Sequence, residues 1–212
     1  MEPIQIIVLR SLTISGTATL LAALWSIPLA YLLASSRRFR PLVYFFEALV
    51  GIPTVLVGLL LYLLLSRNGP LGFLELLYTP QAIIIGEALL ITPLITAVSY
   101  QTILTGLSYY RELALTLGAS DKQAALLVFR ETLPSLISSV VMGFSRAVGE
   151  LGVALIVGGN IKGYTRTMTT SIALATAMGE YEAAVKLGLV LTAIAVGVSL
   201  AVRLVRREWG SE

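Results

Sequence analysis

Apolar residues dominate five long stretches of the chain, and most charged residues lie between them. Each stretch holds about 20 or more mostly apolar residues, which is the length that a helix needs to cross the hydrocarbon core of a bilayer. The stretches are residues 11–34, 42–65, 79–104, 133–157 and 183–204. The pattern predicts an all-α integral membrane protein, with five transmembrane helices in a single domain over residues 1–212.

The segment between the third and fourth stretches, residues 105–132, is too polar to cross a membrane. Its apolar residues still recur at helical spacing, which predicts two short helices. Gly118, Ala119 and Ser120 interrupt the pattern, so we expect a helical hairpin that turns there. Ser120 can cap the second helix because its hydroxyl can accept a hydrogen bond from a free amide of the first turn. Asp121 suits the positive end of that helix.

A shorter apolar run, residues 168–178, follows a glycine-rich segment over residues 158–163. The run is too short to cross a bilayer as a helix. Backbone that does not span the membrane is tolerated at membrane depth only where it is packed in protein or lines a cavity. We therefore expect an interfacial or re-entrant helix here.

The composition narrows the possible functions. Apolar residues make up 57% and charged residues 13% of the chain, a balance unlike that of an ordinary soluble domain. Cysteine and histidine are both missing, which excludes disulfides, thiol nucleophiles, a Ser-His triad and the common ligands of zinc and haem. The Gly-x-x-x-x-Gly-Lys-Ser/Thr loop that cradles ATP is missing as well. We therefore expect no catalytic site, no metal and no cofactor in this chain.

The basic residues between the stretches predict the orientation. The first stretch lacks a basic leader and a small-residue cleavage site, so we expect it to be a permanent span. With five spans the termini lie on opposite sides, and the cytoplasmic side is the one richer in Lys and Arg. A cytoplasmic C-terminus puts nine basic residues inside: Arg37, Arg38, Arg40, Arg111, Lys122, Arg130, Arg203, Arg206 and Arg207. We therefore expect a multi-pass protein of the cell membrane, with its N-terminus outside and its C-terminus in the cytoplasm.

The polar inner segment carries a specific motif. Glu-x-Ala is followed by Gly-Ala-Ser, and Leu133-Pro134 opens the fourth stretch. This arrangement resembles the EAA motif of importer-type ABC permeases, although Leu-Pro lies a few residues further from the glycine than in the general pattern. The resemblance implies the type I ABC importer permease fold, in which this cytoplasmic hairpin is the coupling helix that docks on a separate ATPase. The coupling residues would be Glu112, Ala114, Gly118, Ala119 and Ser120.

Further blocks extend the resemblance over nearly the whole chain. Residues 27–34, 51–58 and 145–152 are similar to the molybdate, sulfate and tungstate permeases, and residues 157–166 with 169–174 are most similar to the tungstate type. The resemblance implies the permease subunit of an ATP-driven oxyanion importer, for tungstate or alternatively for molybdate, sulfate or another anion. The expected partners are a second copy of this chain in a homodimer, two P-loop ATPase subunits that bind ATP and Mg²⁺, an extracytoplasmic substrate-binding protein, membrane lipid and the oxyanion. No nucleic acid is expected.

Four charged residues lie inside the predicted spans, where an unpaired charge costs at least ~2.5–3.5 kcal/mol. Arg146 and Glu150 are four residues apart, so they share a helix face and can pair. This pair lies at the transport pathway or dimer seam in one interpretation, and is a buried structural ion pair in the other. Glu47 and Glu87 lie nearer to the ends of their spans, where we expect structural carboxyls that reach headgroup water.

Two glycine-containing segments are candidates for the transport pathway. In the second stretch, Gly51, Pro53, Thr54 and Gly58 can form a constriction that opens and closes, or a simple packing kink. The outer segment after the fourth stretch offers glycine amides and sparse positive charge, which suits the mouth of an anion pathway. Its residues can equally contact a binding protein. They are Gly158, Gly159, Asn160, Lys162 and Arg166.

Two other functional classes compete with this prediction. A secondary transporter or channel would be expected to show inverted repeats, and none is visible in the sequence. An intramembrane enzyme would need a catalytic constellation, which the sequence lacks. The prediction is therefore an ABC permease that works by alternating access, with the identity of the oxyanion and any regulation by it left open.

Overall fold

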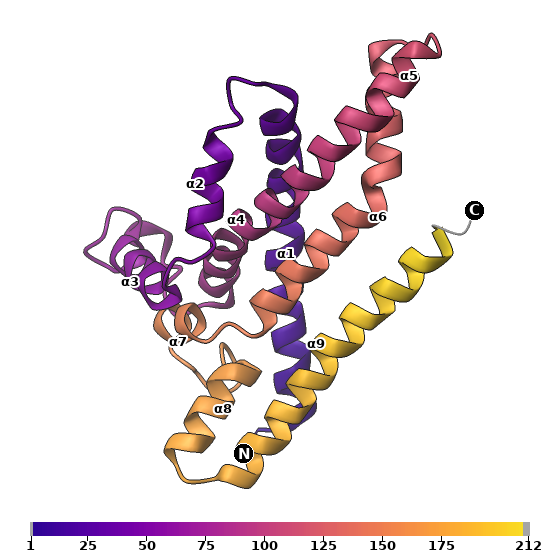
Figure 1. The fold of residues 1–212 in the computed structure, drawn as a ribbon. Helices are drawn as coiled ribbons and strands as arrows, with labels where there is room; N and C mark the ends of the chain where they lie inside the picture. Colours follow the sequence, from indigo (N-terminus) through magenta and orange to yellow (C-terminus); the bar gives the residue numbers. More distant parts are fainter. Residues whose placement is uncertain (1, 210–212) are drawn as a thin grey trace.

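The computed structural model describes the backbone of residues 2–209 and the side chains of residues 2–201. The described chain is built of helices joined by short connections (Figure 1). The side chains of Arg203, Arg206 and Arg207, which contribute to the predicted orientation, lie outside the described part. The elements are α1 (Ile4–Ser35), α2 (Leu42–Leu49), α3 (Thr54–Leu65), the 3₁₀ turn η1 (Gly72–Leu74), α4 (Pro80–Gly106), the π-helical turn η2 (Leu107–Arg111), α5 (Glu112–Thr116), α6 (Asp121–Val148), α7 (Gly152–Gly158), α8 (Met168–Ala177) and α9 (Tyr181–Trp209).

Four helical units are long and apolar enough to cross a membrane: Ile4–Ser35, Pro80–Thr116, Asp121–Val148 and Tyr181–Ala201. The bent pair of α2 and α3 meets the same criterion together, which raises the number to as many as five. Large apolar side chains on the outward faces of these helices remain exposed, including Leu20, Leu24 and Leu189. Exposed apolar surface of this extent needs lipid around it, in agreement with the predicted all-helical membrane protein.

Helix α4 packs against both α1 and α6, and the three helices form the centre of the molecule (Figure 1). Small residues line these contacts: Ala18 and Ala22 of α1 are fully buried, and Ala88 of α4 is 1% exposed. A methyl group on Gly143 of α6 would lie 2.6 Å from Cδ1 of Ile95 in α4. Small residues at such crossings let membrane helices approach closely, and van der Waals contact then stabilises the bundle.

The second apolar stretch is not a single helix. α2 ends at Leu49 and α3 begins at Thr54, and the two helices are bent by 99° relative to each other. Pro53 has extended backbone with ψ of 122° directly before α3, and it has no amide hydrogen with which to continue α2. The prediction of one spanning helix over residues 42–65 is therefore wrong, and the candidate residue Gly51 lies at the break.

The fourth apolar stretch, residues 133–157, also differs from the prediction. α6 begins much earlier, at Asp121, and runs through Pro134 to Val148. A break over residues 149–151 follows, and then the short helix α7. Pro134 does not begin the helix because neighbouring helices can support a proline inside a membrane helix, and here α6 packs along α4.

The hairpin turns at residues 117–120, as expected, but its two arms are not separate short helices. The first arm, α5, continues α4 through η2, so the helical unit extends over Pro80–Thr116. The second arm is the beginning of α6. The predicted coupling segment, residues 105–132, is therefore made of extensions of two central helices, which join its tip directly to the core.

α8 and the start of α9 lie near the N-terminus, at the end of the molecule opposite the hairpin (Figure 1). α8 matches the predicted short helix at residues 168–178, and it packs against α9. α1 begins at Ile4 instead of residue 11, and α9 begins at Tyr181 and continues past residue 204. Hydropathy marks the apolar centre of a helix, while the polar turns at its ends are added by hydrogen bonding and packing.

Candidate functional site

The tip of the hairpin is held by a glycine, a helix cap and an ion pair. Gly118 has φ of +86°, a conformation that glycine adopts without the Cβ penalty of other residues. Ser120 caps α6: its hydroxyl accepts from the amide of Gln123 at 3.4 Å, and the Gln123 side chain accepts from the amide of Ser120 at 2.8 Å. The Arg111 guanidinium donates to the Asp121 carboxylate at 2.7 Å, which joins the two arms. The predicted cap is confirmed, with Gln123 as its second half.

The surface of this tip combines apolar and charged groups. Leu117 is 80% exposed and Leu113 is 48% exposed, beside the exposed side chain of Glu112. Ala114 is buried inside the turn, where its carbonyl accepts from the amide of Ala119 at 3.0 Å. An exposed apolar patch with a charged rim is typical of a surface that binds another protein. Of the five predicted coupling residues, Glu112, Gly118 and Ser120 are therefore on the outside, and the two alanines shape the turn.

The two helix breaks bring α3 and α7 into contact (Figure 1). A methyl group on Gly152 of α7 would lie 2.6 Å from Oγ1 of Thr54 and 3.1 Å from the amide nitrogen of Val55. A methyl group on Gly58 of α3 would lie 3.2 Å from Cα of Val153. The candidates Thr54 and Gly58 thus belong to one tight crossing of two half-helices. Gly51 and Pro53 lie outside it, at the bend.

Arg146 and Glu150 form the predicted ion pair, with the Arg146 guanidinium donating to Oε2 of Glu150 at 2.8 Å. The prediction that they share a helix face is wrong, because α6 ends at Val148 and Glu150 lies in the break after it. Oε1 of Glu150 accepts from the amide of Val153 at the start of α7 at 3.2 Å, and its backbone carbonyl accepts from Oγ1 of Thr169 at 2.7 Å. Glu150 therefore joins α6, α7 and α8.

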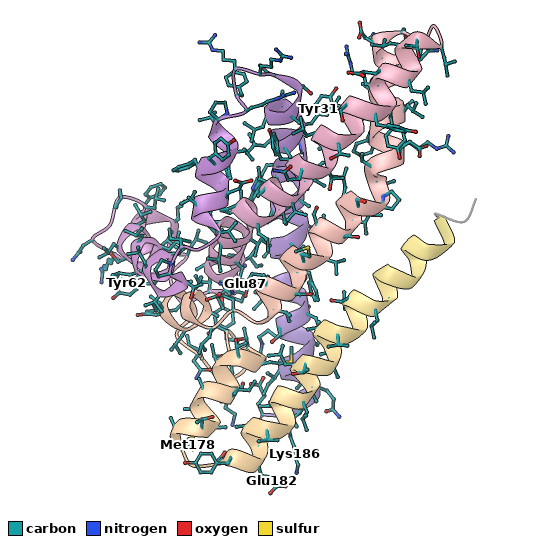
Figure 2. The ribbon with its side chains drawn as sticks, in the orientation of Figure 1. Tyr31, Tyr62, Glu87, Met178, Glu182 and Lys186 are labelled. Carbon is teal, nitrogen blue, oxygen red and sulfur yellow. The ribbon has the colours of Figure 1, made fainter. Side chains whose placement is uncertain are left out.

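The two other carboxyls of the predicted spans have different surroundings. Glu87 does not reach headgroup water as expected: it is 1% exposed in the middle of the molecule (Figure 2), and its Oε2 has no partner among the described residues. Glu87 is near the end of its predicted span in the sequence. In the fold, Ala18 of α1 and Ala147 of α6 pack in one cluster with the adjacent Ala88, and Val153 of α7 lies against Gly86. Glu47 is exposed on α2.

The segment after α7 folds into a compact loop over residues 158–167, named the outer loop after its predicted side of the membrane. Oγ1 of Thr165 accepts from the amide of Ile161 at 2.9 Å and donates to the carbonyl of Gly158. Nε of Arg166 donates to Oδ1 of Asn160 at 3.1 Å, and a second guanidinium nitrogen donates to the Asn160 carbonyl at 3.3 Å. Gly159 has φ of +68° and packs against the ring of Tyr78. Of the five outer candidate residues, Asn160 and Arg166 thus bond to each other, Gly158 bonds to Thr165 in the same loop, and Lys162 is exposed on it.

Glu2 fastens this outer loop to α1. One carboxylate oxygen of Glu2 accepts from the Arg10 guanidinium at 2.5 Å, and the other accepts from the amide of Gly163 at 3.2 Å. Arg10 also donates to the carbonyl of Arg166 at 2.9 Å. The hydrogen bond from Arg10 lowers the pKa of the Glu2 carboxyl from its usual value. The glycine amides of this segment were expected to be available to an anion. The amide of Gly163 is instead bonded to Glu2, and that of Gly159 donates to the Leu155 carbonyl at 3.1 Å.

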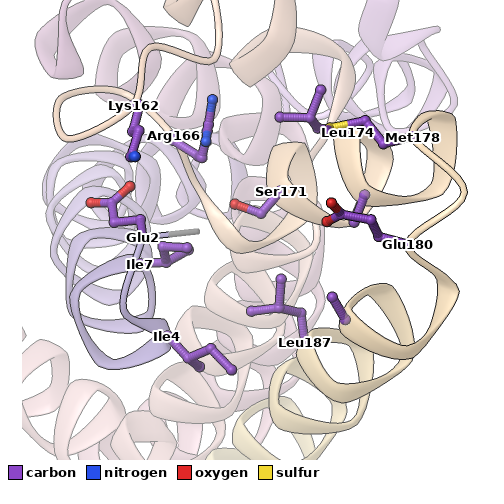
Figure 3. A pocket seen from close by; sticks show the side chains of 12 residues that line it. Glu2, Ile4, Ile7, Lys162, Arg166, Ser171, Leu174, Met178, Glu180 and Leu187 are labelled. Atoms are coloured by element: carbon purple, nitrogen blue, oxygen red, sulfur yellow. The ribbon is translucent and has the colours of Figure 1, made fainter.

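A cavity of about 280 Å³ lies beside the outer loop, between the N-terminus of α1, α8 and the start of α9 (Figure 3). Lys162 and Arg166 lie on one side of it next to Glu2, and Ser171 and Glu180 come from the α8 side. Both signs of charge thus line this outer cavity. The hairpin and the outer loop lie toward opposite ends of the molecule (Figure 1).

The match to known proteins decides between the transport classes. Residues 22–209 match the family described as the inner membrane component of binding-protein-dependent transport systems. The chain belongs to this family. It is therefore a multi-pass membrane permease, and the predicted family resemblance is confirmed. The match covers α4 and α6, the hairpin, both helix breaks and the outer loop.

The relatives of this permease include tungstate and molybdenum permeases. It is 42% identical over 207 residues to the tungstate uptake system permease of Peptoclostridium acidaminophilum, which covers 95% of this chain and 90% of the relative. The tungstate permease of Campylobacter jejuni is 40% identical, over 75% of this chain and 66% of the relative. The molybdenum permease of Mycobacterium tuberculosis is 31% identical, over 93% and 78%.

A solved amino acid ABC transporter shares the fold of this permease. Its chain matches with a TM-score of 0.67 at 15% identity, over 95% of this chain and 92% of that chain. At this identity the likeness concerns the path of the backbone and not the substrate. The permease therefore has the architecture of an ABC transporter membrane subunit.

Proposed function

We propose that this chain is the permease subunit of an ATP-driven ABC importer for tungstate. The observation that carries the proposal is the 42% identity to a tungstate permease over 95% of the chain. Identity of this extent covers the pathway candidates and the hairpin together. The more distant molybdenum permease makes molybdate the second candidate substrate.

The proposed topology has five spans of the type I importer fold, with the N-terminus outside and the C-terminus in the cytoplasm. The bent pair α2 and α3 counts as one span in this topology. The hairpin and the α1–α2 loop then lie on the cytoplasmic side, where Arg37, Arg38 and Arg40 follow the positive-inside rule. The outer loop and the cavity beside it then face the substrate-binding protein.

The proposed complex contains two copies of this chain, two P-loop ATPase subunits that bind ATP and Mg²⁺, and an external binding protein. This chain acts as a transporter component and not as an enzyme. The exposed Leu113, Leu117 and Glu112 of the hairpin would dock on the ATPase. Closure of the ATPase pair would move the hairpin. Because the arms of the hairpin continue into α4 and α6, this movement would reach the core. It would there switch the pathway from inward-open to outward-open.

The crossing of α3 and α7 is the proposed gate. Gly58 and Gly152 keep the two half-helices in contact, so a small movement of either helix changes the width of this crossing. Glu150 connects it to α6, which carries the hairpin at its other end. Sparse charge suits an anion pathway because strong fixed charge would hold a divalent anion in place.

Elemental mass spectrometry tests this function in cells. Tungsten, molybdenum and sulfur are measured in cells with and without this gene, grown at scarce tungstate and molybdate and ordinary sulfate. We expect a loss of tungsten alone. A loss of molybdenum with little change in tungsten would favour the second candidate, and no change in any of the three elements would refute the oxyanion proposal.

A further inference from the structure

A second cavity, of about 710 Å³, lies beside the base of the hairpin. Its walls come from the C-terminal end of α1, the α1–α2 loop, the end of α4 and η2. Tyr31 marks this end of α1 in Figure 2. The cavity is separate from the crossing of α3 and α7 and from the outer cavity, and none of its residues lines either of them.

Arg40 is the central feature of this inner cavity. Its Nε is buried and has no hydrogen-bond partner among the described residues. One terminal nitrogen donates to the carbonyl of Ala34 at 3.4 Å, which is long for a hydrogen bond to a cation. Buried polar atoms in folded proteins are nearly always paired, so an acceptor that enters the cavity would complete the hydrogen bonds of this guanidinium.

The charges around Arg40 favour an anion. Arg111 also lines the cavity, and Glu112 is the acidic residue among the lining side chains. Arg111 is partly neutralised by Asp121 on the hairpin, while the exposed Arg37 and Arg38 of the α1–α2 loop add positive charge nearby. The hydroxyl groups of Tyr31, Ser35 and Ser108 are further possible donors.

We propose that this inner cavity binds a tetrahedral oxyanion group of the phosphate type, with Arg40 as its main donor. A guanidinium presents paired N–H groups that match two oxygens of such a group. Two sources carry this chemistry: the phosphate of an anionic phospholipid, and a free oxyanion in solution. That the cavity faces the cytoplasm and the inner leaflet rests on the proposed topology, whereas the binding itself does not depend on orientation or on transport.

The test compares variants of the purified full-length permease. Arg40→Gln removes the main donor, and Arg37→Gln is its matched control, because it removes an equal charge from an exposed position of the same loop that does not line the cavity. Thr105→Phe fills the cavity from α4 and leaves Arg40 in place, which keeps the test valid if Arg40→Gln folds poorly. Size-exclusion chromatography checks that each variant is intact.

Two probes distinguish the sources. Phosphatidylglycerol retained by the permease is counted by native mass spectrometry, with phosphatidylcholine as the neutral reference, and binding of inorganic tungstate and phosphate is measured by equilibrium dialysis. We expect Arg40→Gln and Thr105→Phe to weaken binding of at least one anionic probe roughly tenfold, with Arg37→Gln close to wild type. Weaker binding of phosphatidylglycerol identifies the lipid phosphate as the group that enters the cavity. Weaker binding of the inorganic anions identifies the free oxyanion instead.

Two results would overturn the proposal. In the first, all three variants bind both kinds of probe as wild type does. In the second, Arg37→Gln loses as much binding as Arg40→Gln, which would indicate general surface charge instead of a site. Because neither probe requires ATP or uptake, failure here would leave the importer proposal intact, and failure of the uptake experiment would leave this one intact.

Discussion

Charged side chains within this permease connect helices that are far apart in the sequence. Glu150 joins Arg146 on α6 to the first turn of α7, and its carbonyl receives the hydroxyl of Thr169 on α8. At the outer end, Glu2 and Arg10 hold the loop that carries Arg166. In both places a carboxylate is satisfied by a guanidinium and a backbone amide together, which lowers the cost of removing it from water.

The ion pair of Arg146 and Glu150 is testable by variants that remove one or both charges. Arg146→Leu leaves the carboxylate of Glu150, only 2% exposed, without its cation, so we expect the folded state to lose about 1–3 kcal/mol. Arg146→Leu combined with Glu150→Gln should recover part of this loss, because the amide oxygen can still accept from Val153. Folded yield and melting temperature in detergent measure the effect, and equal losses in the single and double variants would refute the pairing.

The contact between Glu2 and the outer loop should depend on pH. The folded-state pKa of Glu2 is lowered from its usual value of 4.5 by the hydrogen bond from Arg10. Its contribution to stability is therefore fully present above about pH 4.5 and is lost as pH falls through the lower folded-state value. We expect exchange of the Gly163 amide, relative to its intrinsic rate, to accelerate in this acidic range.

Glu2→Gln provides the control for that prediction, because glutamine does not titrate. Its Gly163 amide should exchange faster than in wild type at neutral pH and show no further change, relative to the intrinsic rate, below pH 4.5. Equal exchange in the two proteins across the range would mean that Glu2 does not hold the loop.

Of these two connections, between Arg146 and Glu150 and between Glu2 and the outer loop, the sequence spacing predicted only the first. Arg146 and Glu150 are four residues apart, a distance at which side chains can meet locally whether or not the helix continues. Glu2 and Gly163 are 161 residues apart, and no local pattern indicates their contact. Glu87 was misjudged for the same reason: burial of its carboxyl depends on which helices pack against α4, and hydropathy carries no information on that.

Two broken helices, α2–α3 and α6–α7, meet where α3 packs against α7, beside α4. The contact depends on glycine, because a methyl group on Gly152 would lie within 3.1 Å of the Val55 amide nitrogen and closer still to Thr54. Glycines at such positions allow half-helices to touch through their backbones. The gate proposal therefore concerns a contact between two elements and not one residue.

Gly152→Ala is expected to push α3 and α7 apart. Overpacking of this kind costs about 1–3 kcal/mol, and combination with Thr54→Ala should relieve part of it, because the nearest atom, Oγ1 of Thr54 at 2.6 Å, is then removed. Gly188→Ala is the matched control, because a methyl group there meets no atom within 4 Å. Thermal melting and uptake are the measurements, and a Gly152→Ala protein as stable and active as the control would contradict the tight crossing.

Gly118→Trp tests the hairpin as the coupling element. Its φ of +86° and its exposed position mean that a tryptophan would strain the turn and obstruct a docking surface, without a clash inside the bundle. We expect a protein that inserts and dimerises but shows no ATP-dependent uptake. Gly197→Trp is the control for a bulky side chain, because Gly197 lies on α9 with open space around it, away from the hairpin and the outer cavity. Normal uptake by Gly118→Trp would refute the role of the hairpin.

The elements were predictable from the sequence to different degrees. Runs of apolar residues located every helix that is long enough to span, and the glycine and cap residues located the hairpin turn. The breaks at residues 50–53 and 149–151 were missed because apolar residues continue on both sides of each break, so hydropathy showed one unbroken stretch. The start of α6 at Asp121 was predicted through the Ser120 cap. Its continuity with the fourth stretch was missed, because Pro134 suggested a new helix start where packing against α4 supports a continuous helix.

The whole molecule connects its two ends through continuous helices. α4 with η2 and α5, and α6, both run from the hairpin into the core, where they meet α1 (Figure 1). The outer loop and its cavity lie at the opposite end, fastened to α1 by Glu2. In the proposed importer, these continuous helices would carry a movement of the hairpin on the ATPase across the bilayer.

Uptake of tungstate by the reconstituted transporter tests the proposed function most directly. The permease and its ATPase are reconstituted into proteoliposomes, and the binding protein is added with tungstate. Tungsten inside the vesicles is then measured by mass spectrometry, with ATP and with a non-hydrolysable ATP analogue. We predict accumulation that requires ATP, the binding protein and an intact hairpin. Accumulation that is the same with the analogue, or no tungsten uptake from an assembled complex, would contradict the proposal that this chain is a tungstate importer permease.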